Sequence, residues 1–128
     1  MPTGEGFSPE QRRDVDRAIR AAEMACRFEF SVFFGHAEDD KRDYAERLHA
    51  VMASPDRSVL VMVDPGAHAL EVVTGKVVRR DLDDDAVRLA VLTMRSAFAD
   101  GDLVGGITRG LAMMAEAAHR PETLHTTE

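Results

Sequence analysis

The sequence predicts a single α/β domain, a three-layer α/β/α sandwich in which helices cover both faces of a small mixed sheet of three to four strands. Three observations predict this fold class. Apolar residues alternate along 28–34, residues 59–63 are apolar at every position, and longer segments repeat apolar residues at helical spacing. A chain of 128 residues, 45% of them hydrophobic, can bury one core without a disulfide or a structural metal. The expected order of elements is α-β-α-β-β-α-α.

The first helix is expected to begin after Ser8. This serine can cap the helix, Pro9 suits its first position, and Gln11 completes a capping box. Apolar residues then recur at helical spacing as far as Cys26, the single cysteine of the chain. We therefore expect Cys26 to be a small buried thiol rather than a reactive one.

The first strand is expected over residues 28–34. One face carries only apolar side chains, whereas the other face includes Glu29 and Ser31, which favours a place near the edge of the sheet. The helical spacing of apolar residues over 40–52 predicts the second helix, and it must end before Pro55.

The second strand is expected over residues 58–64, in the centre of the sheet. Its middle is apolar on both faces, which is typical of a strand that is covered on both sides. Residues 64–68 have the length and composition of a turn, and 69–74 return as a third, antiparallel strand. The first two strands must then be parallel and joined by a right-handed crossover.

Two helices are expected in the remainder of the domain, at 83–99 and 103–119. Residues 77–78 could form either a short strand or a helical turn. Gly106 and Gly110 lie four apart in the last helix, and we expect them to allow the helix to approach the sheet closely.

Charge and length bear on the location and partners of the chain. The net charge of −7 argues against binding to nucleic acid or to an anionic membrane surface. The first residues lack the basic and apolar regions of a secretory signal, and the longest apolar run, 59–63, is far below the roughly 20 residues that span a bilayer. We therefore expect a cytoplasmic domain at 1–120 and a flexible tail at 121–128, with no membrane insertion.

One edge of the predicted sheet is the best place for a site, because ligands favour the carboxyl ends of parallel strands. The side chains expected at this edge are His36, Asp39, Asp64 and His68. Carboxylates and imidazoles suit a divalent cation such as Ca²⁺ or Mg²⁺, or acid and base catalysis. The alternative is that Asp64 serves the turn, that Asp39 or Asp40 caps the next helix, and that both histidines are solvated.

A second acidic cluster lies at residues 81–85. Asp81, Asp83 and Asp85 match the first three ligand positions of an EF-hand loop. However, Ala86 replaces the required glycine and Leu92 replaces the last acidic ligand. Acidic residues in the first turn of a helix complement its dipole, so capping explains this cluster better than calcium binding.

Other catalytic and cofactor motifs are absent from the sequence. No segment matches a phosphate-binding loop, a dinucleotide-binding loop, a zinc HExxH helix or a nucleophile elbow. Catalytic residues are therefore not identified, and these motifs indicate no cofactor, which leaves Ca²⁺ or Mg²⁺ as the candidate. Lys76, Arg79 and Arg80 follow the third strand and could bind an anion, although a solvated basic turn is the alternative.

Five segments line up in order with one family pattern. They are residues 31–34, 44–48, 59–63, 70–75 and 96–107. The most specific part is the run Phe-x-x-Gly-Asp-x-x-x-Gly-Ile that ends the last of these segments. The chain resembles the TPM domain family over most of its length, and most nearly a short actinobacterial branch described as a domain of unknown function. The resemblance implies a compact α/β/α fold.

The resemblance also implies two kinds of function. One plant member is described as an acid phosphatase that binds divalent metals, and other members are accessory factors in membrane-protein assembly or repair. Acidic positions that are offered for this chemistry fall near Asp56, Asp64 and Asp81 of this chain. Many relatives have Asp-Asn-Gly before the second strand, where this chain has an arginine, Arg57.

We therefore expect a non-catalytic binding or accessory protein. Its partner would be an unknown protein, and the chain itself would be a monomer or a weak homodimer. The alternative is a weak phosphatase that depends on a divalent metal.

Overall fold

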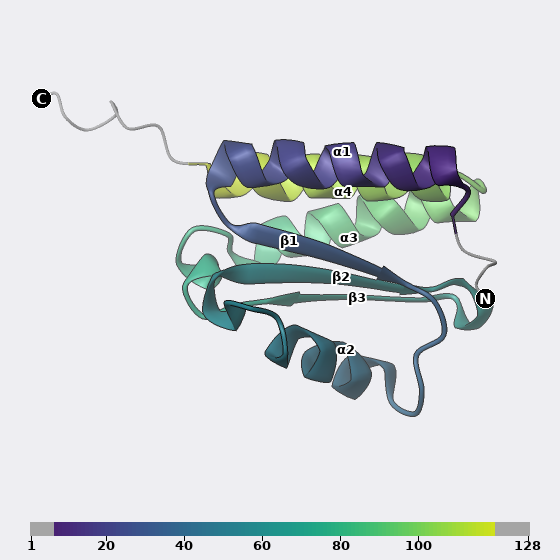
Figure 1. Cartoon of the computed structure of the whole chain (residues 1–128), viewed down its shortest axis with the longest axis horizontal. Helices are drawn as coiled ribbons and strands as arrows, with labels where there is room; N and C mark the ends of the chain where they lie inside the picture. Colours follow the sequence, from purple (N-terminus) through teal and green to yellow (C-terminus); the bar gives the residue numbers. More distant parts are fainter. Residues whose placement is uncertain (1–6, 120–128) are drawn as a thin grey trace, which may run out of the picture.

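The computed structural model describes residues 7–119 (Figure 1). Its helices and strands, in chain order, are α1 (Pro9–Cys26), β1 (Glu29–Phe34), α2 (Lys41–Ala50), η1 (Pro55–Arg57), β2 (Ser58–Asp64), η2 (Pro65–Ala67), β3 (Ala69–Thr74), η3 (Val78–Arg80), α3 (Asp84–Ala99) and α4 (Leu103–Ala118). The order matches the prediction, and the open segment at 77–78 leads into a 3₁₀ turn rather than a strand. The expected tail at 121–128 lies outside the described residues.

The sheet has three strands within residues 7–119, in the order β1-β2-β3. β1 runs parallel to β2, with Glu29 opposite Ser58. β3 runs antiparallel to β2, with Ala69 opposite Asp64. The predicted central position of β2 is confirmed, and every residue of β2 is buried.

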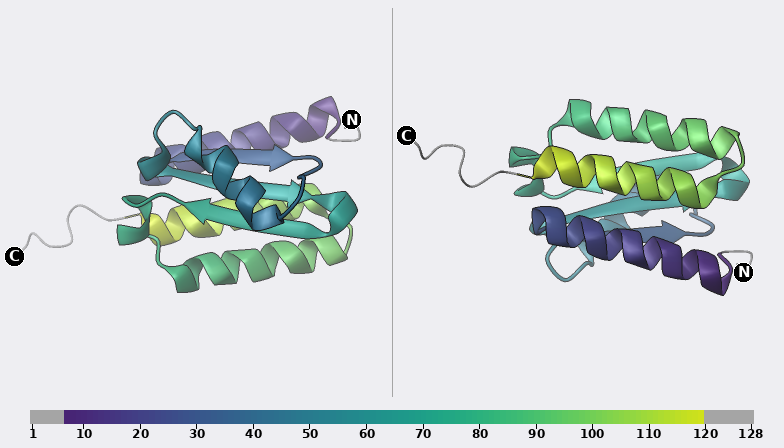
Figure 2. Two further views of the ribbon diagram at one scale, coloured as in Figure 1. Left: turned by 90° about the horizontal axis from the view of Figure 1, so that it is seen from below. Right: turned by 90° about the horizontal axis from the view of Figure 1, so that it is seen from above.

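Helices cover both faces of this sheet, which confirms the three-layer sandwich. α1, α4 and α3 lie side by side over one face, and α2 lies alone against the other (Figures 1 and 2). α4 is the middle helix of its layer, because it packs extensively against both α1 and α3. No helix among residues 7–119 is both long enough and apolar enough to cross a membrane.

Two hydrophobic clusters lie on the two sides of β2. Val59, Val61 and Val63 contribute to the larger cluster, which they share with α1, α3 and α4. Leu60 and Met62 contribute to the smaller cluster, which they share with α2. The apolar residues at every position of the strand are thus explained, because each face of β2 needs its own core.

Acidic and hydroxyl side chains cap the four α-helices of residues 7–119, and of these caps the sequence did not predict Asp102. Ser8 accepts the N–H of Gln11 and forms the expected capping box. Asp40, Asp83 and Asp102 cap α2, α3 and α4 in the same way. Each cap satisfies a backbone donor that the helix itself leaves without a partner.

The two glycines of α4 have a different role from the one expected. A Cβ added at Gly106 would lie 2.7 Å from the Phe98 ring, and one at Gly110 would lie 2.6 Å from Met94. Both neighbours belong to α3. The expected close approach of α4 to the sheet is therefore wrong, because these glycines instead allow two helices of one layer to lie close together.

Candidate functional site

Asp64 is the centre of the predicted edge, but the protein backbone already occupies its carboxylate. The residue ends β2 and is only 3% exposed. Its Oδ2 atom accepts the N–H of Ala37 at 3.0 Å, and its Oδ1 atom accepts the N–H of Ala67 at 3.2 Å. The Nζ atom of Lys41 lies 3.4 Å from Oδ2. Asp64 thus joins the loop after β1, the turn after β2 and the first residue of α2.

These contacts determine the protonation state of Asp64. Burial by itself would raise the pKa of the carboxyl group, because it disfavours the charged form. The N–H groups of Ala37 and Ala67 and the Lys41 ammonium act in the opposite direction and hold the pKa of Asp64 below its usual value. Asp64 is therefore ionised at neutral pH, and each of its oxygens accepts one backbone N–H.

The other three residues predicted at this edge are all exposed, and their positions relative to Asp64 differ. His36 is exposed, and its Nδ1 atom lies 3.6 Å from Oδ2 of Asp64. His68 is exposed and has a left-handed backbone at the end of the η2 turn, with φ of 54°. Asp39 is exposed in the loop before α2, with φ of 58°, and Asp40 rather than Asp39 caps that helix.

The two remaining predicted residues lie at the opposite end of the sheet. Asp56 belongs to η1, which precedes β2, and its carbonyl accepts the N–H of Val77. Asp81 follows η3 and is near enough to Cys26 for its charge to affect that thiol. The length of β2, roughly 20 Å, separates this end from Asp64. Among residues 7–119, no three His, Cys, Asp or Glu side chains are grouped so that they could hold a metal ion.

Arg57, at which the chain departs from the TPM pattern that it resembles, has a structural partner. Its guanidinium lies 5.0 Å from the centre of the Phe28 ring. This is the distance of a cation–π contact. Arg57 therefore fixes the start of β2 against the start of β1, and it keeps a positive charge beside Asp56.

The thiol of Cys26 is half-buried rather than fully buried. Burial, followed by the negative charges of Glu23 and Asp81, raises the pKa of this thiol. Its Sγ atom lies 3.3 Å from the carbonyl oxygen of Ala22. A raised pKa leaves less of the reactive thiolate, which agrees with a packing role.

A cleft of about 590 Å³ opens at the carboxyl end of β2, and we call it the β2-end cleft. It is lined by Val63, Asp64, Pro65, His68, Ala69, Leu70, Arg95, Phe98, Ala99, Gly101 and Leu103. Most of this lining is apolar, and the exposed charged or titratable side chains are His68 and Arg95. Within residues 7–119, Arg95 takes part in no hydrogen bond or ion pair. The cleft therefore combines an apolar wall with a guanidinium that has free donors.

Sequence reasoning identified Asp64 and His68 but missed Lys41 and Arg95. Lys41 directly follows the helix cap Asp40, so its position at the same edge of the sheet could have been predicted from the sequence. Arg95 comes from α3, far along the chain, and no motif signals its approach to the end of β2.

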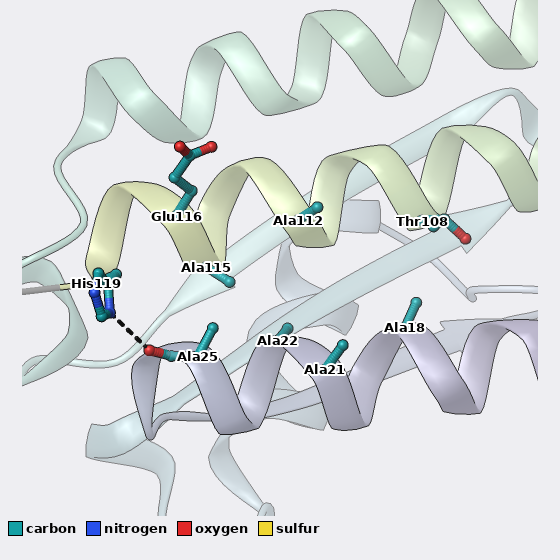
Figure 3. Close-up of a pocket in the computed structure, with 9 residues that line it drawn as sticks. All are labelled: Ala18, Ala21, Ala22, Ala25, Thr108, Ala112, Ala115, Glu116 and His119. Atoms are coloured by element: carbon teal, nitrogen blue, oxygen red, sulfur yellow. Dashed lines mark hydrogen bonds between the residues drawn. The ribbon is translucent and has the colours of Figure 1, made fainter.

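A shallower hollow of about 400 Å³ lies between α1 and α4 (Figure 3). Most of its lining side chains are alanines, from Ala18 to Ala25 on one helix and from Ala112 to Ala115 on the other. At one end, a ring nitrogen of His119 lies 3.0 Å from the carbonyl oxygen of Ala25. This hollow offers small apolar surface but no group of reactive side chains.

Solved structures share this fold at low sequence identity. The BA42 protein of the psychrophilic bacterium Bizionia argentinensis matches 88% of this chain with 81% of its own, at a TM-score of 0.76 and 20% identity. The N-terminal domain of the cg2496 protein of Corynebacterium glutamicum matches 88% of this chain with 74% of its own, at a TM-score of 0.73 and 12% identity. These likenesses concern the fold alone.

Sequence comparison assigns the family. Two curated proteins of Mycobacterium tuberculosis, named Uncharacterized protein MT2543 and Uncharacterized protein Rv2468c, are each 31% identical to this chain over 101 residues. The match covers 79% of this chain but only 60% of each relative. The family model described as Domain of unknown function (DUF5130) matches residues 1–115. The chain therefore belongs to the DUF5130 family.

Proposed function

We propose that this chain is a non-catalytic binding or accessory domain of the TPM-like kind that acts in the cytoplasm. The observation that carries the proposal is the occupied state of Asp64. Each of its oxygens accepts a backbone N–H, and a lysine ammonium lies 3.4 Å away. A nucleophile or a general base acts through a lone pair that faces a substrate, whereas each oxygen of this carboxylate already accepts a backbone N–H.

The same contacts argue against a phosphatase in which Asp64 holds a metal. A divalent cation at the carboxylate would have to compete with the Lys41 ammonium and share the oxygens with the N–H groups of Ala37 and Ala67. It would also need several more oxygen ligands within about 2.6 Å. Asp56 and Asp81, which the family resemblance also suggests, lie at the other end of β2. We therefore favour binding over metal-dependent hydrolysis.

The β2-end cleft supplies the surface for binding. Its volume of about 590 Å³ is in the range of small-molecule sites. Its lining is mostly apolar, and His68 and Arg95 are exposed at its wall. A ligand with an apolar body and one anionic group fits this chemistry, because a carboxylate or sulfonate can form a bidentate pair with a guanidinium.

A fluorescent probe with this chemistry tests the cleft. We expect anilinonaphthalene sulfonate, which joins an aromatic body to one sulfonate, to bind the folded protein at one saturable site. Ala99→Trp should block the cleft and remove the fluorescence increase, since Ala99 is an exposed lining residue at the end of α3. Ala117→Trp is the matched control, because Ala117 is exposed on α4 and does not line the cleft. Equal loss of binding in both variants would contradict the proposal.

A hydrolysis assay tests the absence of catalysis. We expect no turnover of p-nitrophenyl phosphate with Mg²⁺ or Ca²⁺, and no shift of the melting temperature on adding either ion. Metal-dependent turnover that Asp64→Asn abolishes would overturn the non-catalytic proposal and favour the phosphatase. Sedimentation of the same sample tests the expected monomer or weak homodimer.

A further inference from the structure

A second groove follows the free edge of β3. Its volume is about 430 Å³, and it lies between β3 and α3, which run alongside each other (Figure 2). Within residues 7–119, β3 pairs with β2 only, so its other edge is open to this groove. Four arginines from three elements line it, namely Arg42 of α2, Arg79 of η3, and Arg88 and Arg95 of α3. We call it the β3-edge groove.

Two of these arginines are fixed on the backbone of β3. Nη1 of Arg42 donates to the carbonyl oxygen of Val72 at 2.8 Å, and Nη1 of Arg79 donates to the carbonyl oxygen of Thr74. A guanidinium has five N–H donors, so both side chains keep donors for a ligand. Because a strand already holds these two groups in place, a ligand would lose less free energy in ordering them.

Guanidinium groups outnumber carboxylates in the lining of the groove, although the chain as a whole carries −7. Arg42 pairs with Glu71 at 3.3 Å and with Glu46 at 3.0 Å, and Arg88 pairs with Asp85 at 2.6 Å. These pairs are exposed or partly exposed, and such pairs contribute little free energy, so an incoming carboxylate can exchange with them. Within residues 7–119, Arg79 and Arg95 form no ion pair with a carboxylate. The groove therefore offers two unpaired guanidinium groups on an acidic protein.

The arginines are spread along the strand rather than gathered at one point. Arg79 contacts Thr74 at one end of β3, and Arg95 lies beside Leu70 at the other. Four residues of strand separate these ends, which is roughly 13 Å. A single small anion cannot contact both ends, whereas an extended chain of anionic groups can. Between them, Val87 and Val91 of α3 give the groove an apolar floor.

We propose that the β3-edge groove binds an extended acidic segment of a partner protein. Carboxylates of the segment pair with the arginines, and its apolar side chains contact Val87 and Val91. The backbone of the segment does not extend the sheet, because Arg42 and Arg79 occupy edge carbonyls of β3. The inference goes beyond the proposed function, since it names the class of partner and uses a different groove, although Leu70 and Arg95 line both.

Fluorescence anisotropy tests this inference with a labelled peptide that alternates Glu with Val. We expect saturable binding at about 20 mM salt that weakens steeply as salt is added, because screening acts on exposed charges. The same peptide with Gln in place of Glu should not bind. Arg88→Ala combined with Arg95→Ala should weaken binding about tenfold or more. Neither change should disturb the fold, since within residues 7–119 Arg88 pairs only with the exposed Asp85 of its own helix and Arg95 forms no hydrogen bond or ion pair.

A matched control variant shows whether weaker peptide binding depends on the groove or only on the net charge. Arg12→Ala combined with Arg13→Ala removes the same charge from exposed positions on α1, outside the groove, and should leave binding nearly unchanged. Equal weakening in both double variants, equal binding of the Gln peptide, or equally tight binding of an oligonucleotide of the same charge would overturn the inference. Arg88 lines the β3-edge groove but not the β2-end cleft, so Arg88→Ala alone should weaken peptide binding and leave the binding of anilinonaphthalene sulfonate unchanged, which separates the two sites.

Discussion

At the scale of single residues, Asp64 is the side chain whose role changes most between sequence and structure. Its position at the end of β2 was predictable from the strand pattern. Its contacts were not, because Ala37 and Lys41 approach from the crossover between β1 and β2, whose path depends on the packing of α2. The sequence could therefore identify the edge and the carboxylate but not its use.

Asp64→Asn should destabilise the protein at neutral pH by about 1–3 kcal/mol, because an amide cannot accept both backbone N–H groups. Asp39→Asn is the control, since Asp39 is exposed and asparagine tolerates its left-handed backbone. That variant should stay within about 0.5 kcal/mol of the parent. Urea unfolding measures both, and equal stability of the parent and Asp64→Asn would contradict the structural role.

The same carboxylate gives a pH dependence with a defined sign. The pKa of Asp64 is lowered in the folded state from an ordinary value of 3.8. Its contribution is thus complete above pH 3.8 and is lost as the pH falls through the lower, folded-state pKa. The stability difference between the parent and Asp64→Asn should shrink below about pH 4. A difference that grows toward low pH in urea titrations would argue against this assignment.

Cys26 should react slowly in the folded protein. Burial raises its pKa, and alkylation requires the thiolate. At pH 8 we expect iodoacetamide to modify Cys26 several-fold more slowly than it modifies glutathione, and unfolding in urea should remove the difference. A folded-state rate above that of glutathione would identify a reactive thiol instead.

At the scale of elements, residue patterns predicted the strand bounds and the helix starts, because these depend on residues that are close in the sequence. The bounds of β2 and β3 follow from runs of apolar residues between turns, and the helix starts follow from caps such as Ser8 and Asp83. The partner of α4's glycines was mispredicted, because spacing within a helix indicates a close neighbour but not which one. The β3-edge groove could not be predicted from the sequence either, since its arginines come from three separate elements, α2, η3 and α3.

Among the glycines of residues 7–119, Gly75, which follows β3, should be the least tolerant of substitution. A Cβ there would lie 2.1 Å from the carbonyl oxygen of Pro55 and 2.4 Å from that of Asp56. Backbone atoms cannot move aside as a flexible side chain can, so Gly75→Ala should cost about 3 kcal/mol. Gly66→Ala is the matched control, because its Cβ would meet only Asp64 at an ordinary 3.6 Å. Similar urea midpoints for the two variants would contradict this close approach.

At the scale of the whole molecule, the two faces of the sheet are covered unequally. Three helices and the larger cluster protect one face, and α2 with the smaller cluster protects the other. Pattern analysis predicted helices on both faces but not their division, because amphipathicity does not say which face a helix covers. Among residues 7–119, α2 is therefore the α-helix that packs against the sheet without another α-helix packed extensively beside it.

Native-state hydrogen exchange should detect this inequality. Amides of α2 should exchange through local opening at a free energy at least about 1 kcal/mol below that of β2, whose amides should require global unfolding. The bond between His49 and the carbonyl of Ser58 limits this opening, so His49→Ala should widen the gap. Equal exchange free energies in α2 and β2 would indicate that the two layers unfold as one unit.

The pairing of α1 with α4 has a consequence for the order of events during synthesis. Among the helices of residues 7–119, α1 is synthesised first, and its main helical neighbour, α4, is synthesised last. Until α4 emerges from the ribosome, the alanine side of α1 remains uncovered, and the nascent chain cannot complete its larger cluster. Folding of the described domain therefore cannot be completed before α4 has emerged, and a chain arrested before Leu103 should be captured by chaperones that bind exposed apolar helices.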